Sequence, residues 1–237
     1  MGMRLTSAVI ASAMVLSWPA SAHKPTFGEG RYGAPDRAYA VEDIDHSIVV
    51  YQEITCDERE LWLRFSAPEA GKGLFVQLGV PTIDRLERYR PTLAVIAPGL
   101  PSPQRQLPFA IPAGMGVEVL SAETARAFHE PFTGTDSWIL VERTLTLSSA
   151  GSGYIVAWDP DARPGKLWVA VGKKEAFGLA DLFRFFSWRS QAQAFHEVGA
   201  PAPHAAAACQ STLARAGGRP PDANPIGSGY AAESCAS

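Results

Sequence analysis

The sequence predicts an all-β fold, an antiparallel β-sandwich or jelly roll of about eight strands with one C-terminal amphipathic helix. Three observations predict it. Apolar residues recur with a period of two between residues 46 and 177, the gaps between these stretches hold Pro, Gly, Ser or Asp, and no helical period interrupts them. Period-two alternation is typical of strands with one buried face, and many short strands without helices between them are typical of sandwiches.

Residues 1–22 have the features of a secretory signal peptide. A basic start precedes an apolar run over residues 5–18, and Ala20-Ser21-Ala22 forms an A-x-A exit. The apolar run is shorter than the roughly 20 residues that cross a bilayer. No later stretch of the sequence is long and apolar enough to do so. We therefore expect cleavage after Ala22 and a soluble mature protein, periplasmic or secreted, with no stable membrane span.

The body of the chain divides into an N-terminal arm over residues 23–45 and a sandwich domain over residues 46–198. The strand candidates in this domain are residues 46–54, 61–65, 74–80, 93–97, 117–120, 138–147, 154–158 and 166–171. We expect the last two to form a hairpin, in which Tyr154, Val156 and Trp158 meet Leu167, Val169 and Val171 across the core. The segment 81–91 carries mixed charges and is expected to be a loop or a short helix.

Two C-terminal segments break the strand pattern. From Leu179 to Val198, apolar side chains fall at helical spacing, so we expect one amphipathic helix that packs on the sandwich and ends at Gly199. From 199 to 237, Ala, Gly, Pro and Ser dominate. Such a segment buries too little apolar surface to offset its ordering entropy, so we expect a disordered tail.

The composition favours a binding protein over several other classes. The chain of 237 residues carries 21 Lys and Arg against 24 Asp and Glu, a formal charge of -3. A nucleic-acid binder would normally show a basic face instead. No phosphate loop, dinucleotide fingerprint or zinc-type Cys/His spacing occurs. We expect a binding module rather than an enzyme, with a hydrolase on a sandwich scaffold as the third possibility.

Three cysteines follow the leader, and an odd number leaves at least one outside an intrachain disulfide. We expect a buried Cys56 and a disulfide between Cys209 and Cys235 in the tail. The alternative is a reactive thiol or an intermolecular bridge.

The most informative single residue is His23, because cleavage after Ala22 makes it the first residue of the mature chain. A terminal histidine offers its free amine and its ring Nδ1 as a chelate, and the amine loses its proton near neutral pH. Imidazole and amine nitrogens bind copper best among the divalent first-row metals. Residue type and position therefore predict a copper ligand at His23.

Here the leader and the Ala22-His23 junction resemble secreted copper-binding proteins whose mature chain begins with histidine, namely the periplasmic copper carriers and the histidine-brace proteins. The resemblance implies a second histidine on the same metal. The candidates are His46, at a strand entry, and His129, in a loop before the Thr133-Gly134 turn, with His196 as a third. We expect His196 to interact with the helix dipole instead.

The alternative is that cleavage merely exposes a histidine and that no metal binds. The protein would then be an aromatic-faced module that binds a glycan or another protein, since Trp62 and Trp168 alternate with the aliphatic residues of their strands. Exposed rings on a sheet stack on sugars. We expect both rings to be buried instead, beneath the helix or the arm.

Overall fold

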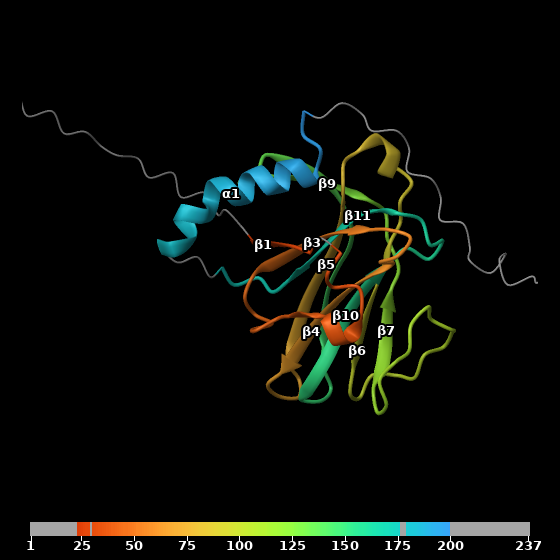
Figure 1. The fold of residues 1–237 in the computed structure, drawn as a ribbon. Helices are drawn as coiled ribbons and strands as arrows, with labels where there is room; N and C mark the ends of the chain where they lie inside the picture. Colours follow the sequence, from red (N-terminus) through yellow and green to blue (C-terminus); the bar gives the residue numbers. More distant parts are fainter. Residues whose placement is uncertain (1–22, 29, 176–178, 200–237) are drawn as a thin grey trace, which may run out of the picture.

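The computed structural model describes residues 23–28, 30–175 and 179–199. Within them, eleven strands form two sheets that pack face to face, with one α-helix beside them (Figure 1). The predicted all-β sandwich with a C-terminal helix is confirmed. The short strands at the N-terminus are parallel to their neighbours, whereas all other paired strands are antiparallel.

The first sheet has six strands. Their order across the sheet is β1 (Lys24–Phe27), β3 (Ile48–Ile54), β11 (Gly165–Val171), β5 (Gly73–Pro81), β9 (Thr135–Thr146) and β8 (Arg126–Glu130). The second sheet has five, in the order β2 (Tyr39–Ala40), β4 (Glu60–Ala67), β10 (Gly151–Trp158), β6 (Thr92–Ala97) and β7 (Gly116–Leu120). Two 3-10 turns, η1 (Pro35–Arg37) and η2 (Asp84–Leu86), lie in the connections.

The main core lies between the sheets. Alternate residues of each strand point inward, as in Leu63, Leu78 and Val169, which are fully buried in one apolar cluster. This alternation is the period-two pattern of apolar residues that the sequence shows, because the side chains of a strand alternate between its two faces.

The outer faces of both sheets are also covered. On the five-stranded sheet, Trp62 and Trp158 lie beneath Phe109, whose ring centroid is 5.2 Å from that of Trp62. On the six-stranded sheet, Tyr51 and Trp168 lie beneath the helix. Each sheet therefore buries apolar side chains on both faces.

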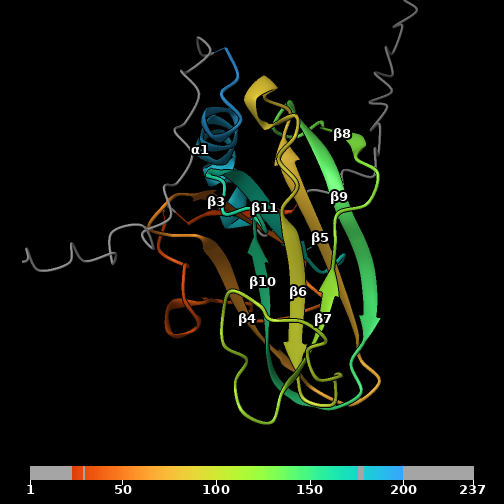
Figure 2. The same cartoon turned by 90° about the vertical axis from the view of Figure 1, so that its right-hand side faces the viewer.

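The helix α1 (Leu179–Phe195) runs past one end of the sandwich next to β3 and β11, as both views show (Figure 1, Figure 2). Its inner side buries Trp188 and Ala192. Asp181 in its first turn forms an ion pair of 3.3 Å with Lys24 of β1. None of the helices in the described residues is long and apolar enough to span a membrane.

Three expectations about elements are wrong. The expected arm contributes strands β1 and β2, one to each sheet. The predicted loop around His129 is strand β8. The expected hairpin of residues 154–158 and 166–171 does not form, because β10 and β11 belong to different sheets. Ile155 and Ala157 of β10 reach the core between the sheets. Tyr154, Val156 and Trp158 lie on the other face of β10, which a covering loop also buries.

Cys56 also differs from expectation. It lies exposed in the β3–β4 turn and is disulfide-bonded, with its partner outside the described residues. The turn that joins the two sheets leaves this side chain accessible to another segment, whereas the sequence suggested burial. The predicted tail over 199–237 lies outside the described residues except for Gly199.

Candidate functional site

His23 lies on the outer face of the six-stranded sheet. Strand β1 runs parallel to β3, with Lys24 opposite Ile48 and Pro25 opposite Val49. Because strand residues alternate, His23 shares the face of Pro25 and Val49, which is the face that α1 covers. Its ring nitrogen Nε2 is buried.

His23 lines two adjoining hollows. The inner cavity has a volume of about 30 Å³, and the outer groove, along β5 and β8, has a volume of about 460 Å³. Four residues line both, which are His23, Gln77, Phe128 and Glu130. The inner cavity has room for about two or three water molecules, since one water needs ~10–15 Å³. It can therefore take a single ion or a water, but not an organic cofactor.

Glu130 is the carboxylate of this cavity. It ends strand β8, and its Oε1 accepts a hydrogen bond of 3.1 Å from the backbone N–H of Phe132. Burial raises the pKa of Glu130, while that hydrogen bond and nearby His129 act in the opposite direction. Burial likewise raises the pKa of Tyr51, and the charge of Glu130 adds to this shift.

The cavity wall beneath α1 is a chain of three hydrogen-bonded side chains. The indole N–H of Trp168 donates to Ser137 Oγ over 3.1 Å, and Ser137 Oγ lies 3.1 Å from His196 Nε2. His196 Nδ1 lies 2.8 Å from the carbonyl oxygen of Ala192 and must donate to it. Ser137 therefore donates to Nε2. Burial lowers the pKa of His196, which favours the neutral ring that this pattern needs.

A serine that donates to a neutral, oriented imidazole is the arrangement that activates serine nucleophiles. Here the serine hydroxyl also accepts from Trp168, and Ser137 and His196 are only 5% and 6% exposed. The adjoining cavity is too small for an acyl group. These hydrogen bonds therefore join the end of α1 to the six-stranded sheet. The expected interaction of a charged His196 with the helix dipole does not apply, because this hydrogen-bond pattern needs a neutral ring.

The structure places the two predicted second ligands away from the cavity. His129 borders the outer groove but does not line the inner cavity. Its Nδ1 lies 2.8 Å from a carboxylate oxygen of Asp136. His46 precedes β3 and pairs with Asp43 over 3.4 Å, and it lines neither hollow.

No three His, Cys, Asp or Glu side chains gather as a metal-binding group within the described ranges 23–28, 30–175 and 179–199. His23 and Glu130 share the cavity as two side chains. A metal site here therefore needs a third donor of another kind, which the terminal amine would supply after cleavage.

The two predicted sugar-stacking rings are buried as expected. Trp62 and Trp168 are 1% and 3% exposed. Trp62 donates its indole N–H to Glu60 over 2.7 Å, and Trp168 donates to Ser137. Neither ring is available to a glycan.

Sequence reasoning did not find Glu130, Ser137 and Gln77. Gln77 and Ser137 stand at outward positions of long strands, which is also the pattern of a solvent-exposed face, and Glu130 stands on an edge strand that shows no alternation. The covering helix and the N-terminal segment make this face an interior. The only available signal is the Phe128–Phe132 segment, which puts three apolar residues beside two ionisable ones on a short edge strand.

No family model and no curated protein matches the chain. Among solved structures, the chain is similar to the periplasmic lysozyme inhibitor of g-type lysozyme PliG from Aeromonas hydrophila. The TM-score is 0.32 and the sequence identity is 15%, over 64% of this chain and 98% of that chain.

Proposed function

We propose that this protein is an extracytoplasmic binding module that holds one copper ion at the mature N-terminal His23. The observation that carries the proposal is that His23 and Glu130 together line the inner cavity, which has room for a single ion, and also the outer groove that adjoins it. The proposal also rests on cleavage after Ala22, which the leader predicts.

The ligands are the terminal amine, the Nδ1 of His23 and the carboxylate of Glu130. A mixed set of nitrogen and oxygen donors with tetragonal geometry suits Cu(II). The surrounding wall is largely apolar, with Tyr51, Phe128 and Trp168 among its members. Such a wall restricts the access of water and holds the first ligands in place.

The neighbouring histidines have other roles in this proposal. Both ring nitrogens of His196 are engaged, one with Ser137 and one with Ala192, so His196 positions the cavity wall. His129 and His46 each pair with a nearby aspartate. The second ligand is therefore a glutamate rather than a second histidine.

The proposal is tested by titrating Cu(II) into two proteins, the mature chain that begins at His23 and the same chain with one additional N-terminal Ala. The extension converts the amine into an amide and destroys the chelate. We expect the extended protein to lose most of its affinity. Equal affinities of the two proteins would eliminate the site.

Three substitutions locate the second ligand. Glu130→Gln removes the carboxylate charge and should weaken Cu(II) binding by about tenfold or more, as for other changes around metal sites. His129→Ala should leave the affinity unchanged. Glu118→Gln, on the exposed face of β7, is the matched control for losing one carboxylate. A loss with His129→Ala and none with Glu130→Gln would assign the second ligand to the histidine.

The alternative function is metal-free binding of a protein or glycan. The burial of Trp62 and Trp168 removes the predicted sugar-stacking surface. An exposed aromatic surface does exist elsewhere, on α1.

A further inference from the structure

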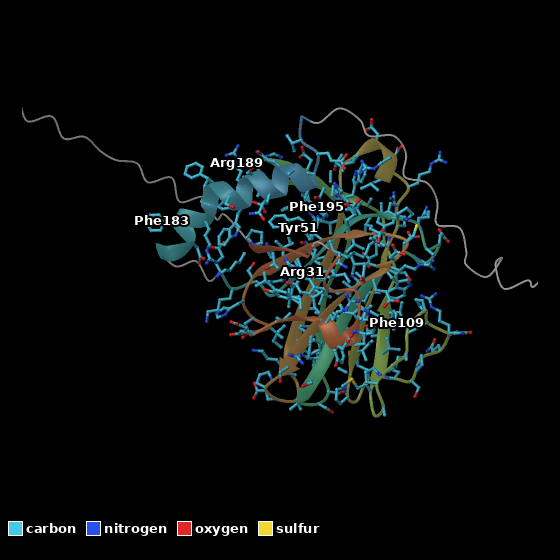
Figure 3. The ribbon with its side chains drawn as sticks, in the orientation of Figure 1. Arg31, Tyr51, Phe109, Phe183, Arg189 and Phe195 are labelled. Carbon is cyan, nitrogen blue, oxygen red and sulfur yellow. The ribbon has the colours of Figure 1, made fainter. Side chains whose placement is uncertain are left out.

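Helix α1 presents aromatic side chains to solvent. Phe183 and Phe186 are 87% and 78% exposed, and with Val198 they are the exposed large hydrophobic residues of the described chain. Figure 3 shows Phe183 on the half of α1 that extends beyond the sandwich, pointing away from the sheets. Large exposed aromatic side chains close together mark an interaction surface.

The orientation of α1 keeps these rings outside. Trp188 and Ala192 are buried on the opposite side of the helix. The ring centroid of Phe185 is 4.3 Å from that of Phe132, and Asp181 is paired with Lys24. Because residues three apart share a helix face, Phe183 and Phe186 form one outward row.

Positive charge surrounds this row. Arg184 and Arg189 are exposed on α1, and Asp181, its acidic residue, is buried against Lys24. Lys173 and Lys174 are exposed at the end of β11, and Glu175 is the exposed acid beside them. Lys174 and β1 lie side by side, because the Lys174 carbonyl accepts from the Ser47 N–H and the Ser47 carbonyl accepts from the Lys24 N–H.

We propose that α1 docks the protein on a bilayer surface that contains anionic phospholipids. Phe183 and Phe186 insert between headgroups, and Arg184 and Arg189 contact lipid phosphates. This combination of an aromatic row and flanking cations is that of helices that lie in the membrane interface. The proposed membrane docking is independent of the copper proposal. The chain as a whole carries a net negative charge. The basic residues around α1 therefore also orient the protein, so that α1 faces an anionic surface.

The same charges disfavour a second copy of the chain as the occupant. A two-fold contact would bring α1 against its symmetry mate. Arg184 and Arg189 of both copies would then gather in one interface with no exposed acidic residue of α1 to balance them.

The test is co-sedimentation of the mature protein with vesicles of phosphatidylcholine alone or mixed equally with phosphatidylglycerol. We expect binding to the mixed vesicles only, and weaker binding as salt is raised, since salt screens exposed charges. The double variant Phe183→Ser, Phe186→Ser should reduce the partition coefficient by about tenfold or more. Arg184→Gln, Arg189→Gln should abolish the preference for the anionic lipid.

The control variant is Arg64→Gln, Arg105→Gln, which removes two exposed arginines on the five-stranded sheet side. It should bind as the wild type does. Because all substituted side chains are exposed, unchanged thermal melts verify that the variants fold. Absence of binding to the mixed vesicles, or equal binding by the Phe double variant, overturns the proposal. A dimer in light scattering that this variant converts to monomer, without vesicle binding, also overturns it and assigns the surface to a second copy.

Discussion

Trp168 connects the sheet, the helix and the cavity at the residue scale. Its ring is buried on the outer face of β11, its N–H donates to Ser137, and Ser137 donates to His196 beyond the end of α1. Loss of the ring would remove packing and leave the Ser137 hydroxyl without the donor from which it accepts. Buried polar groups that lose a partner are costly.

Trp168→Ala should therefore lower the free energy of unfolding by about 3–5 kcal/mol, the range of large-to-small core changes. Trp168→Phe retains most of the packing and should cost less, because it removes only the N–H donor and part of the ring. Urea denaturation followed by circular dichroism measures both. A loss below about 1 kcal/mol for the alanine variant would mean that the ring is not part of the core.

Glu197 makes a second connection at this scale. It accepts from Arg85 over 2.7 Å at Oε2 and 2.5 Å at Oε1, and from Lys166 over 2.8 Å. The hydrogen bond with Arg85 is the main reason that the pKa of Glu197 is lowered from 4.5 to about 2. The partner of Arg85 therefore comes from the segment after α1, far from Arg85 in the sequence.

Because this pKa is lower in the folded state, the stabilisation is present above pH 4.5 and is lost as the pH falls from about 4.5 to about 2. We expect Glu197→Gln to lower stability at pH 7 by roughly 1.5–3 kcal/mol, as for hydrogen bonds to charged groups. Its stability should also fall less steeply in that acid window. Denaturation curves from pH 7 to pH 2 check this, and parallel pH profiles for the two proteins would refute the assignment.

At the scale of the element, alternation predicted eight strands because their inward residues are apolar. It did not predict β8, because residues 126–130 do not alternate between apolar and polar side chains. An edge strand of this kind buries little on either face. It also did not predict β1 and β2, which are too short to show a period. The expected hairpin failed because alternation identifies strands but not the sheet to which each belongs.

Gly79 of β5 tests the packing between elements. It lies opposite Trp168 in the register, and a Cβ there would be 2.1 Å from the ring atom Cζ2 of Trp168. Gly79→Ala should force the ring to move and cost about 1–3 kcal/mol, as overpacking does. Gly73→Ala on the same strand is the matched control, because its nearest contact is 3.4 Å from Thr144. Equal melting temperatures for the two variants would contradict this packing.

At the scale of the whole molecule, the candidate site joins the two ends of the described chain to its middle. His23 comes from the N-terminus, Glu130 from β8, and His196 from the end of α1. The sequence identified His23 because its position after the leader is a local feature. Its partner was not predictable, because the face that carries Glu130 becomes an interior only when α1 and the N-terminal segment cover it.

The most direct test of the copper site is anomalous diffraction at the copper edge from crystals of the mature protein soaked in Cu(II). We expect one dominant peak in the inner cavity, about 2 Å from the amine and Nδ1 of His23, with the Glu130 carboxylate in contact. Peaks only at His129 with Asp136, or at His46 with Asp43, would contradict the proposal, as would the absence of any bound copper.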